Sequence, residues 1–188
     1  KTLNILEKSK KQSQFDYTEI FRHIRTNIEF SNVDNPIKSV AITSSQPGEA
    51  KSTTSMNLAY IFATKYKKVL IIDCDLRKTM LHKYMRLSNS HGLTDALIEL
   101  LYVLTAGIHV PNPSELLSSG TFKEYMKVLK QNFDFIIIDC APIGSISDAI
   151  PVGNAVDGTI FVVSAKDTKR KDAAQCVDLL KRSNVNVI

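Results

Sequence analysis

The chain has 188 residues, of which 44% are hydrophobic and 23% are charged, as is ordinary for one globular domain with its own core. No apolar run is long enough to span a membrane and no secretory signal opens the chain, so a cytoplasmic protein is expected. The net charge of +5 is compatible with nucleotide phosphates, nucleic acid or an anionic membrane surface. The three cysteines are far apart and lack a C-x-x-C spacing, which favours reduced structural thiols.

The N-terminal segment, residues 1–15, is polar and basic, and we expect it to be a loosely held arm before a domain that spans residues 16–188. A helix capped by Asp16 or Thr18 is predicted to run to about Phe30, because its apolar residues recur at helical spacing. Charged residues occupy the opposite arc of this helix and include Glu19, Arg22 and Arg25. Periodicity alone favours a solvent-exposed face with weak ion pairs.

A small-residue loop follows the apolar strand predicted at residues 37–43, ends in Lys51-Ser52, and leads into a helical pattern at 52–65. A phosphate-binding loop requires this order, because backbone N–H groups form an anion cradle and the helix N-terminus adds its dipole. Ser45 and Ala50 replace the two glycines of G-x-x-x-x-G-K-[ST], so the match is degenerate. The predicted nucleotide contacts are Ser44, Ser45, Gln46, Pro47, Gly48, Glu49, Ala50, Lys51, Ser52 and Thr53.

Two strongly apolar strands, predicted at residues 67–75 and 133–139, each carry an aspartate at the carboxyl end, Asp73 and Asp139, and Asp75 lies two residues beyond Asp73. Each aspartate could cap a turn, or could hold Mg²⁺ in the manner of a Walker B residue. A third carboxylate also suits a base that accepts a proton from an incoming hydroxyl. The expected catalytic residues are Lys51, Asp73, Asp75 and Asp139, and the expected metal ligands are Ser52, Asp73, Asp75 and Asp139.

The remaining segments continue the alternation of helices and strands. A short helix is expected at Gly92–Leu97, and the abrupt change from helix to strand suggests that residues are missing near positions 98–102. Helices are predicted at 121–131, 148–156 and 169–182, and strands at 158–164 and from 185 onward. This alternation predicts a single α/β domain of the P-loop NTPase type, with a mostly parallel sheet flanked by helices on both faces and ligands at the carboxyl ends of its strands.

Three motifs together resemble the P-loop ATPases of the partition and Mrp type: the loop Ser45–Ser52, the run Ile71–Arg77, and the D-x-x-P of Asp139–Pro142. The D-x-D-x-R pattern within 71–77 is similar to one branch of them, the bacterial tyrosine kinases of capsule and exopolysaccharide biosynthesis. Glu19–Arg25 matches the E-x-x-R-x-x-R helix through which these kinases pack into rings. Gly107–Leu117 resembles their G-x-x-P-P-N-P-x-E-L-L segment, with Val110 in place of the first proline.

The resemblance implies a kinase that uses ATP and Mg²⁺ to phosphorylate protein tyrosines, mainly in the C-terminal tails of neighbouring subunits. It implies a homo-oligomeric ring built through Glu19, Arg22 and Arg25, and a separate membrane adaptor, a polysaccharide co-polymerase, that recruits the kinase to the inner face of the plasma membrane and governs polysaccharide chain length. Asp73 is the expected base, Asp139 with Asp73 or Asp75 organises the metal, and Arg77 orients neighbouring groups. The six tyrosines are scattered and the sequence stops inside a predicted strand, so a tyrosine-rich tail beyond Ile188 is expected to be absent from this sequence.

Three alternatives belong to other functional classes. A partition or cell-division ATPase acting on DNA or membrane would place a second lysine at the position of Gln46, and no basic–aromatic pattern indicates nucleic acid. An iron–sulfur carrier would need a C-x-x-C pair. An assembly component that uses ATP only to hold a ring would not need the full set of Lys51, Asp73, Asp75 and Asp139.

Overall fold

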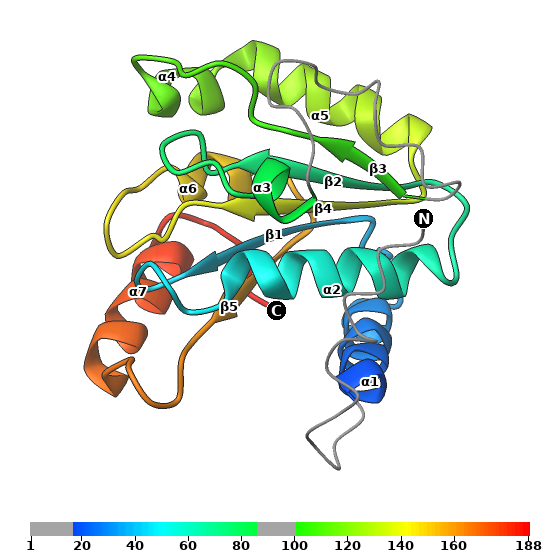
Figure 1. Cartoon of the computed structure of the whole chain (residues 1–188), viewed down its shortest axis with the longest axis horizontal. Coiled ribbons are helices and arrows are strands. Elements are labelled where there is room, and N and C mark those ends of the chain that lie inside the picture. The colour runs from blue at the N-terminus through cyan, green and yellow to red at the C-terminus, as the bar shows by residue number, and fades with distance from the viewer. Residues whose placement is uncertain (1–16, 86–100) are drawn as a thin grey trace.

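The computed structural model describes residues 17–85 and 101–188, in which strands and helices alternate (Figure 1). The strands are β1 (Ser39–Ser44), β2 (Val69–Cys74), β3 (Leu101–Leu104), β4 (Phe135–Cys140) and β5 (Gly158–Val162). The helices are α1 (Tyr17–Phe30), α2 (Lys51–Ala63), α3 (Leu81–Met85), α4 (Pro113–Ser118), α5 (Gly120–Asn132), α6 (Ala149–Gly153) and α7 (Arg170–Arg182). The predicted arm, the predicted helix at 92–97 and most of the segment 98–102 lie outside the described residues.

The five strands form one all-parallel sheet in the order β3-β2-β4-β1-β5, which confirms the predicted α/β class. β4 lies between β1 and β2, so the three strands that lead into the predicted motifs are neighbours. Their carboxyl ends share one edge of the sheet, and Asp73 on β2 stands opposite Asp139 on β4 in the register. The strand expected after residue 185 is reduced to a single bridge between Thr159 and Val187.

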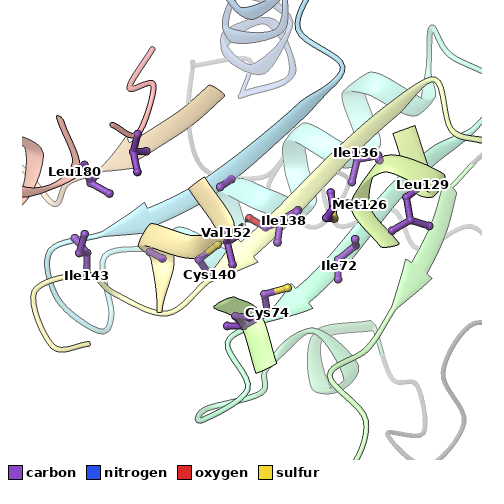
Figure 2. Close-up of a cluster of buried hydrophobic side chains, with 14 of the residues drawn as sticks. Ile72, Cys74, Met126, Leu129, Ile136, Ile138, Cys140, Ile143, Val152 and Leu180 are labelled. Atoms are coloured by element: carbon purple, nitrogen blue, oxygen red, sulfur yellow. Dashed lines mark hydrogen bonds between the residues drawn. The ribbon is translucent and has the colours of Figure 1, made fainter. Parts of the chain in front are cut away.

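The sheet is covered on both faces, and residue parity decides which face each strand side chain joins. Even-numbered residues of β2 and β4 pack with α5, α6 and α7, in the cluster that Figure 2 shows around Ile72, Ile136 and Ile138. Odd-numbered residues of the same strands pack with α1, α2 and α3 on the other face. Asp73 and Asp139 are odd-numbered, so the alternation places both carboxylates on the face that α2 covers.

Helix α1 crosses the C-terminal end of α2 (Figure 1) and buries Ile28 against it. The Arg25 guanidinium donates from Nη1 to the carbonyl of Ile61 at 2.9 Å and to Oγ1 of Thr64 at 3.3 Å. The contact therefore gives the Ile61 carbonyl a partner at the end of α2, where a helix leaves its last carbonyls without backbone partners.

Candidate active site

The loop between β1 and α2 lies against one wall of a cavity of about 490 Å³. Its backbone turns through positive φ at Gly48 (90°) and Ala50 (62°) before α2 begins at Lys51. The cavity is lined by residues that follow β1, β2 and β4: Pro47, Gly48, Ala50, Lys51, Ser52, Thr53, Asp75, Arg77, Lys78, Met80, Ala141, Pro142, Ser145 and Ile146. Its position at a helix N-terminus and at the carboxyl edge of a parallel sheet suits a phosphate-bearing ligand.

The Lys51 ammonium is at the centre of the charged groups of the site. Nζ lies 3.3 Å from Oδ1 of Asp139 and 3.5 Å from Oδ2 of Asp75, and the lysine is only 8% exposed. Ser55, one helical turn after Lys51, donates its hydroxyl to the same Asp139 oxygen at 3.0 Å. The start of α2, the end of β4 and the segment after β2 therefore bring Lys51, Asp139 and Asp75 together.

Asp73 is buried and is held by backbone amides. Oδ1 accepts from the N–H of Asp75 at 3.2 Å, and Oδ2 accepts from the N–H groups of Met80 and Leu81, each at 3.1 Å. Burial raises the pKa of Asp73 to about 6, although the hydrogen bonds from the Leu81 and Met80 amides act to lower it. Asp73 does not line the cavity, whereas Asp75 does. The carboxylate nevertheless has a pKa close to the range in which a general base works.

Asp139 carries the observation that bears most directly on Mg²⁺. Its Oδ2 atom is buried without a hydrogen-bond partner among the described residues, and burial raises the pKa of this carboxyl although Lys51 acts to lower it. Such an atom is costly unless a cation or an ordered water approaches it. Residues 17–85 and 101–188 contain no group of three or more His, Cys, Asp or Glu side chains arranged for a metal ion. The residues fit a P-loop Mg²⁺ site, in which the Ser52 hydroxyl and phosphate oxygens would be ligands and a carboxylate would bind the ion directly or through water.

Glu49 is oriented away from the cavity. Its carboxylate accepts from the Ser45 hydroxyl at 2.9 Å, from the N–H of Gln46 at 2.7 Å and from the Thr168 hydroxyl. The N–H of Ser164 approaches it at 3.4 Å. The side chain therefore joins the two ends of the phosphate loop and ties them to the segment between β5 and α7.

Arg77 joins three segments at the mouth of the cavity. Its Nε donates to Oδ2 of Asp148 at 2.8 Å, and its Nη2 donates to the Ser114 hydroxyl at 3.1 Å. Ser114 in turn donates to Oδ1 of Asp148 at 2.5 Å. The hydrogen bond to Asp148 raises the pKa of the guanidinium, so the clamp keeps its charge. Arg77 fixes the β2–α3 loop against the first residues of α4 and α6.

The turn after β4 packs directly on the phosphate loop. Ile143 donates its N–H to the carbonyl of Ser44 at 2.8 Å. A Cβ at Gly144 would lie 2.2 Å from the carbonyl oxygen of Ser45, so only glycine allows this approach. The two residues that follow the D-x-x-P motif thus support the phosphate loop.

The predicted residues divide into three groups. Most of the predicted nucleotide contacts line the cavity: Pro47, Gly48, Ala50, Lys51, Ser52 and Thr53. Four of them do not, namely Ser44, Ser45, Gln46 and Glu49, whose side-chain or backbone groups bond within the loop. The predicted ring residues Glu19, Arg22 and Arg25 lie on α1 and outside the cavity lining.

Several residues of the site escaped the sequence prediction. The helical spacing of Ser55 from Lys51 could have revealed it, because i and i+4 share a helix face. Asp148 and Ser114 gave no such signal, since their contacts with Arg77 join positions 71 and 37 residues apart.

Comparison with known families first establishes the class of protein. A family model described as an AAA domain matches residues 37–168, which include the phosphate loop, both aspartate motifs and β5. The septum site-determining protein MinD of Pyrococcus horikoshii, solved with Mg-ADP, shares the fold at 21% identity and a TM-score of 0.65. The match covers 80% of this chain and 67% of that one. The chain is therefore an AAA-type P-loop domain.

More similar proteins identify the branch. The tyrosine-protein kinase YwqD of Bacillus subtilis (strain 168) is 44% identical over 177 residues, which cover 87% of this chain and 75% of that protein. The tyrosine-protein kinase CpsD of Streptococcus pneumoniae is 34% identical, with coverage of 88% and 78%. The kinase domain of the Escherichia coli tyrosine kinase ETK superposes with a TM-score of 0.83 at 29% identity, covering 90% of this chain and 72% of that one. The chain belongs to the bacterial tyrosine-protein kinase family and is a protein-tyrosine kinase.

Proposed function

We propose that the chain transfers the γ-phosphoryl group of ATP to tyrosine hydroxyls at the cavity beside the phosphate loop. The approach of Asp75 and Asp139 to the Lys51 ammonium, which lines that cavity together with Asp75, carries the proposal. Loop amides and the N-terminus of α2 would hold the phosphates, and Lys51 would balance charge on the β- and γ-phosphates. Gly48 and Ala50 are exposed and line the cavity, so their backbone groups are accessible to a phosphate.

Mg²⁺ would be held by the Ser52 hydroxyl, with Asp139 and Asp75 acting directly or through water. When bound, it neutralises negative charge that develops on the phosphates. The unpartnered Oδ2 of Asp139 supports this assignment, and Ser55 orients the other oxygen of the same carboxylate. Asp73 is less suited to a metal role, because both of its oxygens accept backbone N–H groups.

We assign the base to Asp73, as the family resemblance implies. A tyrosine hydroxyl has an ordinary pKa of about 10, so its proton must leave while the new bond forms. Burial raises the pKa of Asp73 to about 6, which makes this carboxylate a stronger base than an exposed aspartate and leaves it ionised at neutral pH. Asp75 is the alternative base because it lines the cavity, but it already lies within 3.5 Å of the Lys51 ammonium.

The substrates and partners of the proposed reaction follow from the family resemblance. The acceptors would be tyrosines in the tails of neighbouring subunits, phosphorylated in trans within a ring. A membrane adaptor would recruit the kinase to the inner face of the plasma membrane and couple it to polysaccharide chain length. No helix among the described residues is long and apolar enough to cross a membrane. Exposed Tyr17 and Ile20 on α1, beside Glu19 and Arg22, support α1 as the ring surface.

Phosphotransfer is tested by mixing the protein with ATP, Mg²⁺ and a tyrosine-rich tail peptide, and then measuring phosphotyrosine. Lys51→Met and Asp73→Asn should each remove most of the signal, whereas Lys127→Met on the exposed face of α5 should retain it. The same phosphotyrosine yield in all four proteins would rule out the proposed site. An adaptor tail that changes neither ATP affinity nor phosphorylation would contradict the proposed partner.

A further inference from the structure

The segment between β2 and α3 is fixed at three points. Asp73 accepts the N–H groups at the start of α3, Asp75 Oδ1 accepts the N–H of Lys78 at 3.0 Å, and Arg77 is clamped to Asp148. Lys78 lies between these anchors and lines the cavity together with the phosphate-loop residues. The backbone from which the Lys78 side chain extends is therefore fixed before any ligand binds.

Among the residues that the structure describes, three cations line the cavity, and two of them are paired. Lys51 lies against Asp139 and Asp75, and Arg77 is held by Asp148. The Lys78 side chain is exposed, and within residues 17–85 and 101–188 no carboxylate lies in ion-pairing distance of its ammonium. Among the described residues that line the cavity, Lys78 is thus the cation without an ion pair, so its charge remains available to a ligand.

The phosphate loop itself offers one cation to the transferring group. Gln46 is neutral, and Lys51 is the sole lysine or arginine between β1 and the second turn of α2. Phosphoryl transfer spreads negative charge over three equatorial oxygens, and kinases and GTPases stabilise that charge with more than one cation. A second cation in the lining of the same cavity would complete this arrangement.

We propose that Lys78 is a catalytic residue that stabilises the γ-phosphoryl group during transfer. The inference rests on the phosphotransfer proposed above. The tyrosine oxygen forms a bond to the γ-phosphorus while the bond from that phosphorus to the β–γ bridging oxygen breaks. The phenol proton passes to Asp73, and ADP leaves with the electron pair. Lys78 stays protonated throughout and forms no covalent bond.

The test compares Lys78→Gln with the parent protein in three measurements. These are the Kd of a fluorescent ADP analogue with Mg²⁺, the Kd of the same analogue with aluminium fluoride, and kcat with a tyrosine-rich peptide. We expect ADP binding to change less than about twofold, the aluminium fluoride complex to weaken at least ~30-fold, and kcat to fall about 100-fold. Lys78→Arg should recover most of the kcat.

Lys83→Gln is the matched control, because Lys83 is an exposed lysine on α3 that does not line the cavity. Unchanged kcat and unchanged binding of the aluminium fluoride complex in Lys78→Gln would overturn the proposal. A higher peptide KM at constant kcat would also overturn it and would assign Lys78 to the acceptor. If the parent phosphorylates no peptide, the function proposal fails, and the binding of aluminium fluoride still tests Lys78 by itself.

Discussion

At the scale of single residues, Ala50 occupies a backbone conformation that costs an L-amino acid energy. Its φ of 62° and ψ of 19° lie in the left-handed region, just before α2 begins. Glycine has no Cβ and so avoids this steric penalty, but it loses more conformational entropy than alanine when the chain folds. We expect Ala50→Gly to raise the free energy of unfolding by about 1 kcal/mol, as measured by urea denaturation.

Ala174→Gly provides the matched control, because Ala174 is exposed within the regular helix α7. The same substitution should there lower the free energy of unfolding by about 1 kcal/mol. Equal signs for the two variants would contradict the assignment of strain to position 50.

The pKa of Asp73 makes a prediction about pH. A base must be ionised, and the ionised fraction of Asp73 falls as the pH drops through its pKa of about 6. We therefore expect kcat/KM for the peptide to be level near pH 7.5 and to fall about tenfold for each unit well below pH 6. Asp73→Asn should remove this acid limb along with most of the rate. An acid limb that persists in Asp73→Asn and disappears in Asp75→Asn would transfer the base to Asp75.

At the scale of elements, the turn after β4 and the phosphate loop depend on each other. A methyl group at Gly144 would collide with the Ser45 carbonyl, which belongs to backbone and cannot rotate away. Gly144→Ala should lower the free energy of unfolding by about 1–3 kcal/mol and weaken ADP binding at least ~10-fold. Both effects can be measured on one preparation by denaturation and by nucleotide fluorescence.

Gly120→Ala is the control for this substitution, since open space surrounds Gly120 at the start of α5. It should keep the parent's ADP affinity and should not lower the free energy of unfolding by more than about 0.5 kcal/mol. If Gly144→Ala also binds ADP as the parent does, the loop tolerates displacement and the packing argument fails.

Helix α1 serves the fold of its own subunit as well as the proposed ring. Arg25 caps the end of α2, whereas Glu19 and Arg22 pair with each other on the exposed face. We expect Arg25→Ala to lower the free energy of unfolding by about 1–2 kcal/mol, and Glu19→Ala with Arg22→Ala to change it by less than ~0.5 kcal/mol.

The ring is therefore best tested with Glu19 and Arg22 alone, because replacing Arg25 also weakens the monomer. The double variant should sediment as a smaller species under conditions in which the parent assembles. An unchanged sedimentation mass would leave these two residues as a solvent-exposed face.

Most of the fold could be predicted from sequence because its signals are local. The apolar cores of β2 and β4 and the period of α5 and α7 set those elements within two residues of their observed bounds. The helix predicted at 148–156 is shorter, ending at Gly153, where a side chain would meet Val185.

The site was less predictable, because its decisive contacts join distant segments. Lys51, Asp75 and Asp139 could be assigned to the carboxyl edge of the sheet, because the ends of the apolar strands and the phosphate-loop pattern can be recognised in the sequence. Nothing local indicates that Glu49 turns inward to Thr168, which is 119 residues away. Likewise, nothing in the sequence of the β2–α3 segment indicates that Arg77 bonds to Asp148, which is 71 residues away.

At the scale of the whole molecule, the site concentrates buried negative charge that a ligand can compensate. Asp73 and Asp139 are neighbours in the sheet register, and burial raises the pKa of both. Saturation with ADP and Mg²⁺ at about 100 times Kd should raise the free energy of unfolding by about 2.7 kcal/mol. Calorimetry should show a higher Tm with both than with ADP alone, and Asp139→Asn should lose that difference. No added effect of Mg²⁺ in the parent would contradict the assigned role of Asp139.

The placement of β4 between β1 and β2 also sets when the site can form during synthesis. Lys51 and Asp139 are 88 residues apart, and β1 lacks its inner neighbour until β4 has left the ribosome. At translation rates of about 5–20 residues per second, the phosphate loop precedes its partner by several seconds. Nucleotide capture should therefore mark the completion of the sheet in the nascent chain, and a ribosome-bound chain stalled before β4 emerges should bind no ATP.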